Sequence, residues 1–132
     1  MNRPTFDEGV AQCLRQDPRY PREAYSFVRD ALDFTIRRQM ESGERRQAGH
    51  VSGQQLSEGA RDHALDQFGP LARIVLDAWA IRATDDIGAI VFNLIGVGVF
   101  SKSETDDPAD FHAVFEFEEA FDEPFRPVPT RA

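Results

Sequence analysis

The feature that most constrains this sequence is an apolar run near its middle, which reads I-G-A-I-V-F-N-L-I-G-V-G-V-F from Ile87 to Phe100. Its fourteen residues are too few, and too rich in glycine, to cross a bilayer. A helix that is apolar nearly all round is normally buried on most sides. We therefore expect a central core helix that has Thr84 as its N-terminal cap and two carboxylates in its first turn, and that ends near Val97 or Gly98.

Two shorter amphipathic patterns precede this run and are joined by a tight turn. Ser52, with Gln55 three residues later, predicts a capping box at the start of the first helix. Gly69 and Pro70 are typical of a helix end that is followed directly by a new first turn. Such a short junction indicates a helix-turn-helix unit. The apolar residues that we expect the second helix to turn inward are Leu71, Ile74, Val75, Ala78 and Trp79.

The N-terminal part of the chain adds two more helical patterns. We expect a short helix from about Thr5 to Arg15 and a longer one from Pro21 to about Met40. The sequence therefore predicts a mainly α fold of about five helices, with a helix-turn-helix or winged-helix-like core and, as one alternative, a small two-stranded β wing.

The wing depends on the segments at 99–102 and 114–117, which could pair as two strands. The alternation in V-F-E-F favours a strand, whereas the following E-E-A-F favours a helix. The sequence leaves open whether residues 111–121 form a strand or a helix.

Length and charge indicate one domain with an acidic end. The 132 residues suit a single helical domain over residues 1–121, followed by a loose, proline-rich tail over 122–132. The net charge is −8, and residues 101–132 hold three basic side chains against nine acidic ones. An acidic end opposes non-specific binding to phosphate. No apolar run is long enough for a membrane span, and the N-terminus lacks a signal-peptide pattern, so we expect a cytoplasmic protein.

Motifs for catalysis are missing from the sequence. It holds no G-x-S-x-G, no H-E-x-x-H and no G-x-x-x-x-G-K segment. The lone Cys13 is expected to be a buried structural thiol. We therefore expect neither an enzyme nor a cofactor or metal, and an enzyme would gain support only from a pocket that holds His50, Asn93 and Lys102 together.

The leading functional hypothesis is a protein-binding adaptor or regulatory module. The chain has eleven phenylalanines, several of them crowded among acids in the last quarter, and exposed aromatics with an acidic rim are typical of protein-binding surfaces. Phe121 and Phe125 are expected to be exposed, and a basic partner would suit the charge. The residues that we expect to contact this partner are Phe117, Phe121, Phe125, Glu118, Glu119 and Lys102, the last being the only lysine.

The alternative is a winged-helix-like nucleic-acid-binding protein. Its basic residues would be Arg37, Arg38, Arg45 and Arg46. The central helix argues against it, because that helix offers only two carboxylates and Asn93 as groups that could hydrogen-bond to bases. We expect Asn93 instead to satisfy backbone groups where the helix meets the wing.

Three sequence motifs are similar to those of a known protein family. They are F-G-P-L-A at 68–72, D-I-G-A-I-V-F-N-L at 86–94 and F-x-F-x-x-A-F at 115–121. Together they resemble a small uncharacterised bacterial family that takes its name from a verrucomicrobial locus and whose members are about this length. The resemblance covers the chain from Tyr20 to Phe121 and implies no particular chemistry.

Overall fold

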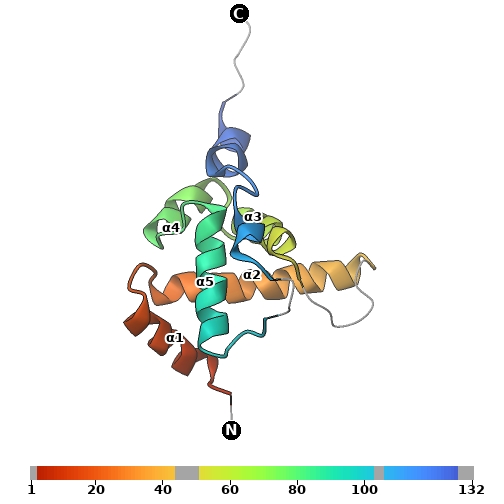
Figure 1. Cartoon of the computed structure of the whole chain (residues 1–132). Helices are drawn as coiled ribbons and strands as arrows, with labels where there is room; N and C mark the ends of the chain where they lie inside the picture. The colour runs from red at the N-terminus through yellow and green to blue at the C-terminus, as the bar shows by residue number, and fades with distance from the viewer. Residues whose placement is uncertain (1–2, 44–50, 103–105, 128–132) are drawn as a thin grey trace, which may run out of the picture.

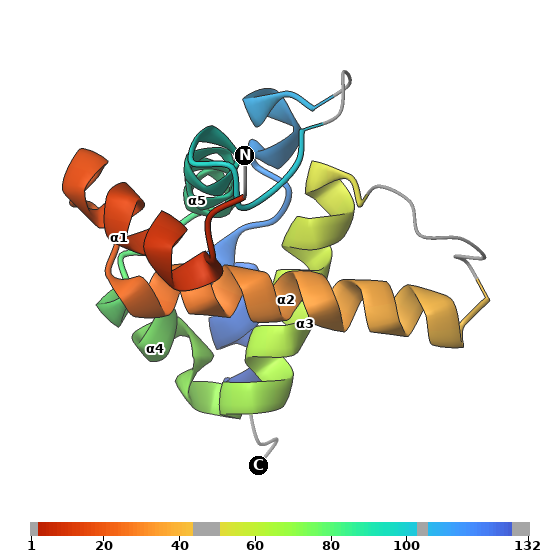
Figure 2. The ribbon, with the colours of Figure 1, turned by 90° about the horizontal axis from the view of Figure 1, so that it is seen from below.

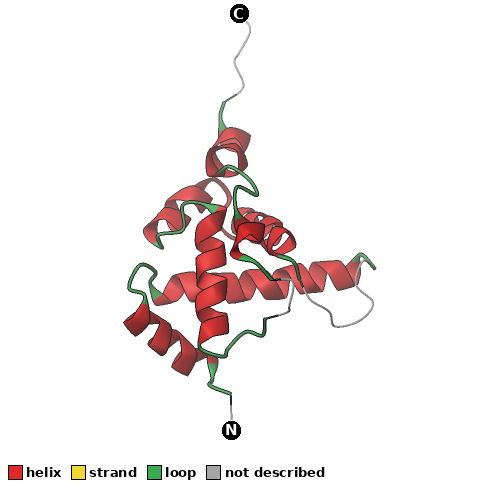
Figure 3. Ribbon diagram, viewed as in Figure 1, coloured by secondary structure: helices red, strands yellow, loops and turns green. Residues whose placement is uncertain are grey.

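The computed structural model describes residues 3–43, 51–102 and 106–127. Within them the chain forms five α-helices joined by loops and short turns, and no strand (Figure 3). The prediction of a mainly α fold with about five helices is therefore confirmed. The helices are α1 (Phe6–Gln16), α2 (Arg22–Glu41), α3 (Gly53–Phe68), α4 (Ala72–Ala78) and α5 (Thr84–Gly96).

Short helical turns complete the described part of the chain. Three are 3₁₀ turns, namely η1 (Gly69–Leu71), η2 (Pro108–Phe111) and η4 (Glu123–Phe125), and η3 (Glu118–Asp122) is one turn of π-helix. Every helix in the described ranges lacks the length and apolar character that crossing a membrane requires.

The helix α5 lies at the centre of the fold, as its apolar sequence predicts. It crosses the long helix α2 and contacts α1, α2 and α3 (Figure 1). Seen from below, α3 also crosses α2, and α1 lies near the start of α2 (Figure 2). Ile87, Ile90 and Leu94 of α5 are fully buried, so this helix supplies much of the core.

Local signals place the ends of α3 as predicted. The Ser52 hydroxyl accepts a hydrogen bond from the Gln55 backbone N–H at 3.1 Å, and the Gln55 side chain accepts one from the Ser52 N–H at 2.9 Å. The predicted capping box is therefore confirmed. At the other end Gly69 has a φ of 51°, in the left-handed region where a β-carbon is strained.

The start of α5 is capped differently from the prediction. Thr84 is the first residue of the helix, and Ala83 holds the cap position. The cap comes from the Asp86 carboxylate, which accepts backbone hydrogen bonds from Arg82 at 2.9 Å and from Ala83 at 3.1 Å. These N–H groups belong to the two residues before the helix, so the carboxylate holds the entering chain, and its negative charge lies at the positive end of the helix dipole.

The freed Thr84 hydroxyl holds a distant loop. It donates to the Phe111 carbonyl at 2.6 Å and accepts from the Val114 N–H at 3.2 Å. Phe111 packs so closely on two helices that a β-carbon at Gly53 or Gly88 would lie within 3.0 Å of it. The loop after η2 is therefore fixed to the start of α5. From there residues 112–116 bend to η3, so residues 111–121 form neither the strand nor the continuous helix that the sequence left open.

The two-stranded wing is not formed. The backbone N–H groups of Val99 and Phe100 both donate to the Leu94 carbonyl, at 2.9 and 3.1 Å, and Gly98 turns the chain with a φ of 86°. This segment closes the end of α5, so its N–H groups are not available to a second strand. Of the predicted winged-helix-like core, the tight α3–α4 turn is the part that is present.

The short helix α4 turns only part of the predicted face to the core: Trp79 packs against Phe27 and Phe68 as expected, but other residues do not face inward. Leu71 and Ile74 are 58% and 69% exposed, and Ala78 is exposed as well, whereas Ala72 and Leu76 are buried. The turn η1 explains the difference. A 3₁₀ turn has three residues per turn instead of 3.6, so the inward stripe of α4 is rotated relative to that of a continuous α-helix from Pro70.

Two residues of the predicted loose tail, Asp122 and Arg126, form ion pairs with preceding residues. The Asp122 carboxylate forms an ion pair with Arg73 of α4, and Arg126 lies 2.5 Å from the Glu118 carboxylate. Residues 122–127 are therefore attached to the domain. The rest of the predicted tail, residues 128–132, lies outside the described residues.

Candidate functional site

The structure separates the phenylalanines that were predicted to bind a partner. Phe117 and Phe121 are 5% and 1% exposed, and their ring centroids lie 5.0 Å apart in an edge-to-face arrangement. Phe115 completes the cluster, with its ring centroid 5.8 Å from that of Phe121. The expected exposure of Phe121 is wrong, because these rings fill the core beneath η3 and gain more from burial than a partner could offer. Phe125 is 44% exposed, as predicted.

The acidic side chains of the same turns face solvent. Glu118, Glu119 and Glu123 are all exposed. The Arg126 guanidinium lies 2.5 Å from Glu118 and 3.7 Å from Glu123, so the nearby basic side chain is engaged within the turns. The two predicted acidic contact residues, Glu118 and Glu119, therefore remain on the surface.

The turn η1 and the helix α4 carry exposed apolar side chains, Leu71 and Ile74. The helix α4 contacts η3, and the Arg73–Asp122 ion pair joins the two elements. Leu71 and Ile74 lie one turn apart and are both more than half exposed. We define the C-terminal surface as Leu71, Ile74, Phe125, Glu118, Glu119 and Glu123.

Lys102 does not belong to this surface. The segment that follows α5 and carries Lys102 lies at the opposite end of α5 from the C-terminal turns (Figure 1). Its ammonium is 6.0 Å from the centroid of the Phe92 ring, and the side chain is exposed. The structure therefore does not bring Lys102 together with the acidic phenylalanine-rich segment, and the wing that would join their two segments is not formed.

The predicted basic patch is only partly described. Arg37 and Arg38 lie exposed on α2, while Arg45 and Arg46 lie outside the described residues. Arg38 is 2.5 Å from the Asp62 carboxylate of α3, so its charge is balanced within the fold. Among the arginines of this patch that the structure describes, Arg37 keeps its charge facing solvent.

Asn93 is part of a polar network inside the fold. Its amide nitrogen donates to the Asp17 carboxylate at 2.9 Å and to the Tyr25 hydroxyl at 3.1 Å, and the Cys13 thiol donates to its backbone carbonyl at 3.5 Å. The expected role at a wing is therefore wrong. The network instead connects α5 to α1, α2 and the loop between them.

Physical causes are visible for the shifted pKa values in this network. Hydrogen bonds from Arg19 hold the pKa of Asp17 well below its usual range, and burial raises the pKa of Tyr25. Burial also raises the pKa of the Cys13 thiol, which is 1% exposed. A thiol with these properties is a poor nucleophile, so the expected structural role of Cys13 agrees with its burial.

The two histidines that the structure describes have different surroundings. His63 lies between two rings, with centroid distances of 5.7 Å to Phe27 and 5.1 Å to Phe34. His112 is exposed and lies 3.0 Å from the Asp85 carboxylate. His50 lies outside the described residues. Within the described ranges, no three histidine, cysteine or acidic side chains are grouped closely enough to hold a metal ion.

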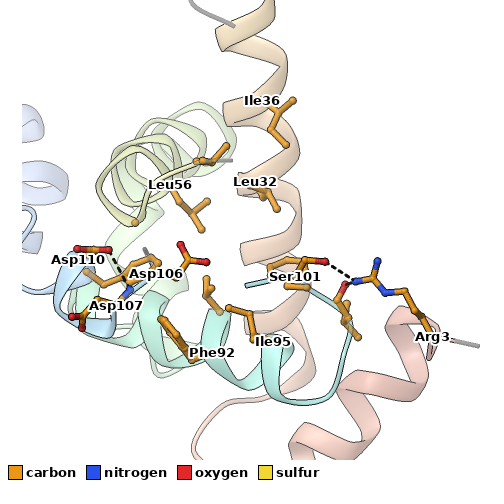
Figure 4. Close-up of a pocket in the computed structure, with 16 residues that line it drawn as sticks. Arg3, Leu32, Ile36, Leu56, Phe92, Ile95, Ser101, Asp106, Asp107 and Asp110 are labelled. Atoms are coloured by element: carbon orange, nitrogen blue, oxygen red, sulfur yellow. Dashed lines mark hydrogen bonds between the residues drawn. The ribbon is translucent and has the colours of Figure 1, made fainter. Parts of the chain in front are cut away.

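A pocket of about 320 Å³ lies where α2, α3 and α5 meet the segment after α5 and the turn η2. We call it the three-helix pocket. Figure 4 shows Asp107 and Asp110 at one end of it and Arg3 at the other. The apolar side chains that project into the space between these ends are Leu32 and Ile36 of α2, Leu56 of α3, and Phe92 and Ile95 of α5.

Sequence reasoning missed this pocket. Neither Asn93 nor Lys102 lines it, so it does not supply the combination that would favour an enzyme. The signal in the sequence was the additional apolar pair Leu32 and Ile36 on α2, which is more than one partner helix needs. Such a pattern shows that a second face is apolar, but it does not tell whether another element fills that face.

Comparisons with known protein families, with curated proteins and with solved structures find no match to this chain. The likeness to the verrucomicrobial-named family stays a prediction that rests on the three motifs.

Proposed function

We propose that this protein is a non-enzymatic adaptor or regulatory module that binds another protein through the C-terminal surface. The observation that carries the proposal is the exposure of Leu71 and Ile74, by 58% and 69%, on a helix held against acidic turns. Exposed apolar side chains beside charged ones are typical of protein interaction sites. Full burial of each such side chain at an interface contributes about 1.5–3 kcal/mol, which is enough for two hot-spot residues in a transient complex.

The charge of this surface favours a partner with basic side chains around an apolar centre. Residues 101–132 hold three basic side chains against nine acids, and both Arg73 and Arg126 are engaged in ion pairs within the fold. The outward field of the C-terminal surface is therefore negative. Complementary charge would speed association and align the partner more than it would tighten the complex.

We propose that the protein is not an enzyme because the groups with shifted pKa values are bound to structural partners. Perturbed pKa values in a cleft are a sign of catalytic groups. Here the shifted groups have structural partners: Asp17 binds Arg19, and Tyr20 donates to the helix-capping Asp86 at 2.6 Å. We propose a cytoplasmic setting, which suits a chain whose lone cysteine is a free, buried thiol.

The proposal is tested with paired variants in which exposed apolar side chains become serine. Leu71→Ser/Ile74→Ser removes the apolar part of the C-terminal surface. Met40→Ser is the matched control, because Met40 is 61% exposed but lies at the far end of α2. Each tagged protein is used for affinity purification from native lysate with and without nuclease, and captured proteins are quantified by mass spectrometry.

The expected result is a partner that survives nuclease, is retained by the wild type and by Met40→Ser, and is lost with Leu71→Ser/Ile74→Ser. Adding Phe125→Ser should weaken it further. Equal capture by all variants would remove the proposal. Partners that disappear with nuclease, and binding to DNA or RNA that weakens steeply with salt, would instead support the alternative of a nucleic-acid-binding protein.

A further inference from the structure

The three-helix pocket has a floor that is well formed yet incompletely covered. Its walls come from three helices, so the backbone beneath it is rigid. Leu32, Ile36 and Ile95 are each only half-buried, although all three project into the same space (Figure 4). An apolar group placed there would remove this surface from water without any rearrangement of the helices.

The size of the pocket limits what it can hold. A volume of about 320 Å³ is at the lower end of the range for small-molecule sites. It equals the liquid volume of about ten water molecules, which suits a ligand of roughly ten to fifteen non-hydrogen atoms. This is the size of one aromatic or branched alkyl group with a short polar extension.

The charged side chains at the two ends of the pocket differ in how many hydrogen bonds they already make within the fold. Arg3 uses its guanidinium to hold the chain after α5: its Nε donates to the Gly98 carbonyl at 3.3 Å, and one Nη donates to the Val99 carbonyl and the Ser101 hydroxyl, both at 3.2 Å. These contacts use three of the five N–H groups of the guanidinium, so Arg3 keeps two for an anionic ligand.

The carboxylates at the acidic end of the pocket keep more of their hydrogen-bonding positions available for a ligand. Asp107 accepts from the Ala109 N–H at 2.9 Å, and Asp110 accepts from the Asp107 N–H at 3.3 Å, so a single oxygen of each carboxylate caps η2. An ionised carboxylate has two oxygens and about four acceptor positions. Both side chains are exposed at the edge of an apolar floor, and Asp106 lines the same pocket, so an approaching ammonium would meet three carboxylates.

We propose that the three-helix pocket binds a small amphiphilic cation. Its aromatic or branched alkyl body would lie on the floor formed by α2, α3 and α5, and its ammonium would lie beside Asp107 and Asp110. The pocket shares no residue with the C-terminal surface, so this inference does not depend on the proposed protein partner. Lys102, with its ammonium 6.0 Å from the Phe92 ring centroid, opposes cation binding and sets an upper limit on its strength.

Three probes of the same size and different charge test the proposal. They are 3-phenylpropylammonium, the neutral 3-phenylpropan-1-ol and the anionic 3-phenylpropanoate, each titrated into the full chain and followed by methyl NMR. We expect shifts at the methyl groups of Ile36, Leu56 and Ile95. The cation should bind about fivefold more tightly than the alcohol, the ratio expected for an ion pair at a partly exposed site, and the carboxylate should bind most weakly.

Three variants separate the role of charge from that of shape. Asp107→Asn/Asp110→Asn keeps acceptors for the η2 cap and should lower the fivefold ratio, with Asp106 as the remaining carboxylate of the lining. Glu23→Gln, which changes an exposed acid on α2 outside the pocket, should leave the ratio unchanged. Ile95→Trp should block all three probes.

Equal affinity of the three probes for the wild type would overturn the proposal, as would shifts confined to other methyl groups or a fivefold ratio that persists in Asp107→Asn/Asp110→Asn. Sedimentation at the NMR concentration provides the remaining check. Self-association that is lost with Ile95→Trp would mean that a second copy of the chain occupies the pocket, and the small-cation proposal would be rejected.

Discussion

Replacing Thr84 by valine tests how the start of α5 holds the loop after η2. Thr84 is 1% exposed, and its hydroxyl donates to the Phe111 carbonyl at 2.6 Å and accepts from the Val114 N–H at 3.2 Å. Valine has nearly the same shape but no hydroxyl, so both backbone groups lose their partner. Each buried group without a partner costs about 1–3 kcal/mol. Because Val114 is only half-buried, we expect the free energy of unfolding to fall by about 2–3 kcal/mol in total.

Two control variants isolate the hydrogen bonds from packing. Thr84→Ser keeps the hydroxyl and loses one methyl group, which should cost about 1 kcal/mol. Thr35→Val removes another hydroxyl at a position that is 1% exposed. That hydroxyl donates to the Ala31 carbonyl of its own helix at 2.7 Å, and this carbonyl keeps its helical N–H partner. Thr35→Val should therefore cost about 0.5 kcal/mol or less.

Urea unfolding followed by far-UV circular dichroism gives the free energies, with an unchanged m-value as the sign that the unfolded state is the same. Amide hydrogen exchange adds a local readout, because the Val114 N–H should exchange faster in Thr84→Val than in Thr84→Ser. The reasoning is refuted if Thr84→Val loses no more stability than Thr84→Ser, or no more than Thr35→Val.

Further predictions concern two glycines and one ion pair. Gly59→Ala should destabilise the fold by about 1–3 kcal/mol, because its β-carbon would lie 1.8 Å from the Thr35 hydroxyl oxygen. Gly96→Ala should raise the free energy of unfolding by about 0.5 kcal/mol, because no atom lies within 4 Å of its β-carbon. Thermal unfolding of both variants checks these values. The Asp85 carboxylate raises the pKa of His112, and His112 in turn lowers the pKa of Asp85. Because the pKa of His112 is raised in the folded state, the ion pair stabilises the fold fully below the ordinary histidine pKa of about 6.5. This stabilisation is lost as the pH rises through the pKa that His112 has in the folded protein. At the acidic end it is lost as Asp85 becomes protonated below its ordinary pKa of about 4. NMR titration should find the pKa of His112 closer to 6.5 in Asp85→Asn, and an identical value in both proteins would contradict the pairing.

Features that depend on neighbouring residues could be predicted from the sequence. The capping box of Ser52 and Gln55 is complete within four residues, and Gly69 ends α3 because the left-handed turn needs no β-carbon. The burial of α5 follows from a composition that leaves no polar face. Each of these signals is read within one or two helical turns, which is the range over which backbone hydrogen bonds and helix periodicity act.

Features that depend on distant residues could not be predicted in this way. The N–H groups of Val99 and Phe100 bind the Leu94 carbonyl instead of a strand, and no pattern within 99–102 distinguishes these outcomes. The burial of Phe117 and Phe121 depends on space left by other helices. Alternating aromatic and acidic residues fit a buried turn as well as an exposed surface, so the sequence did not identify which rings the core would take.

The three-helix pocket is the feature that depends most strongly on residues far apart in the chain. Its walls come from segments as far apart in the chain as Arg3 and Phe111, and each segment alone reads as an ordinary amphipathic helix or polar loop. A pocket forms where packing is incomplete, and incomplete packing is a property of how three helices cross, which small changes in crossing geometry decide.

The polar groups of α5 bear on the choice between a protein and a nucleic-acid partner. A helix that reads bases needs free donors and acceptors on its outer face. Asn93 uses both amide hydrogens inside the fold, Asp86 caps its own helix, and Asp85 is paired with His112. Any contact with nucleic acid would therefore fall to basic residues such as Arg37, and phosphate contacts by such residues carry no sequence information. Binding of that kind would be sequence-independent and would weaken steeply with salt, whereas an apolar contact through Leu71 and Ile74 would persist.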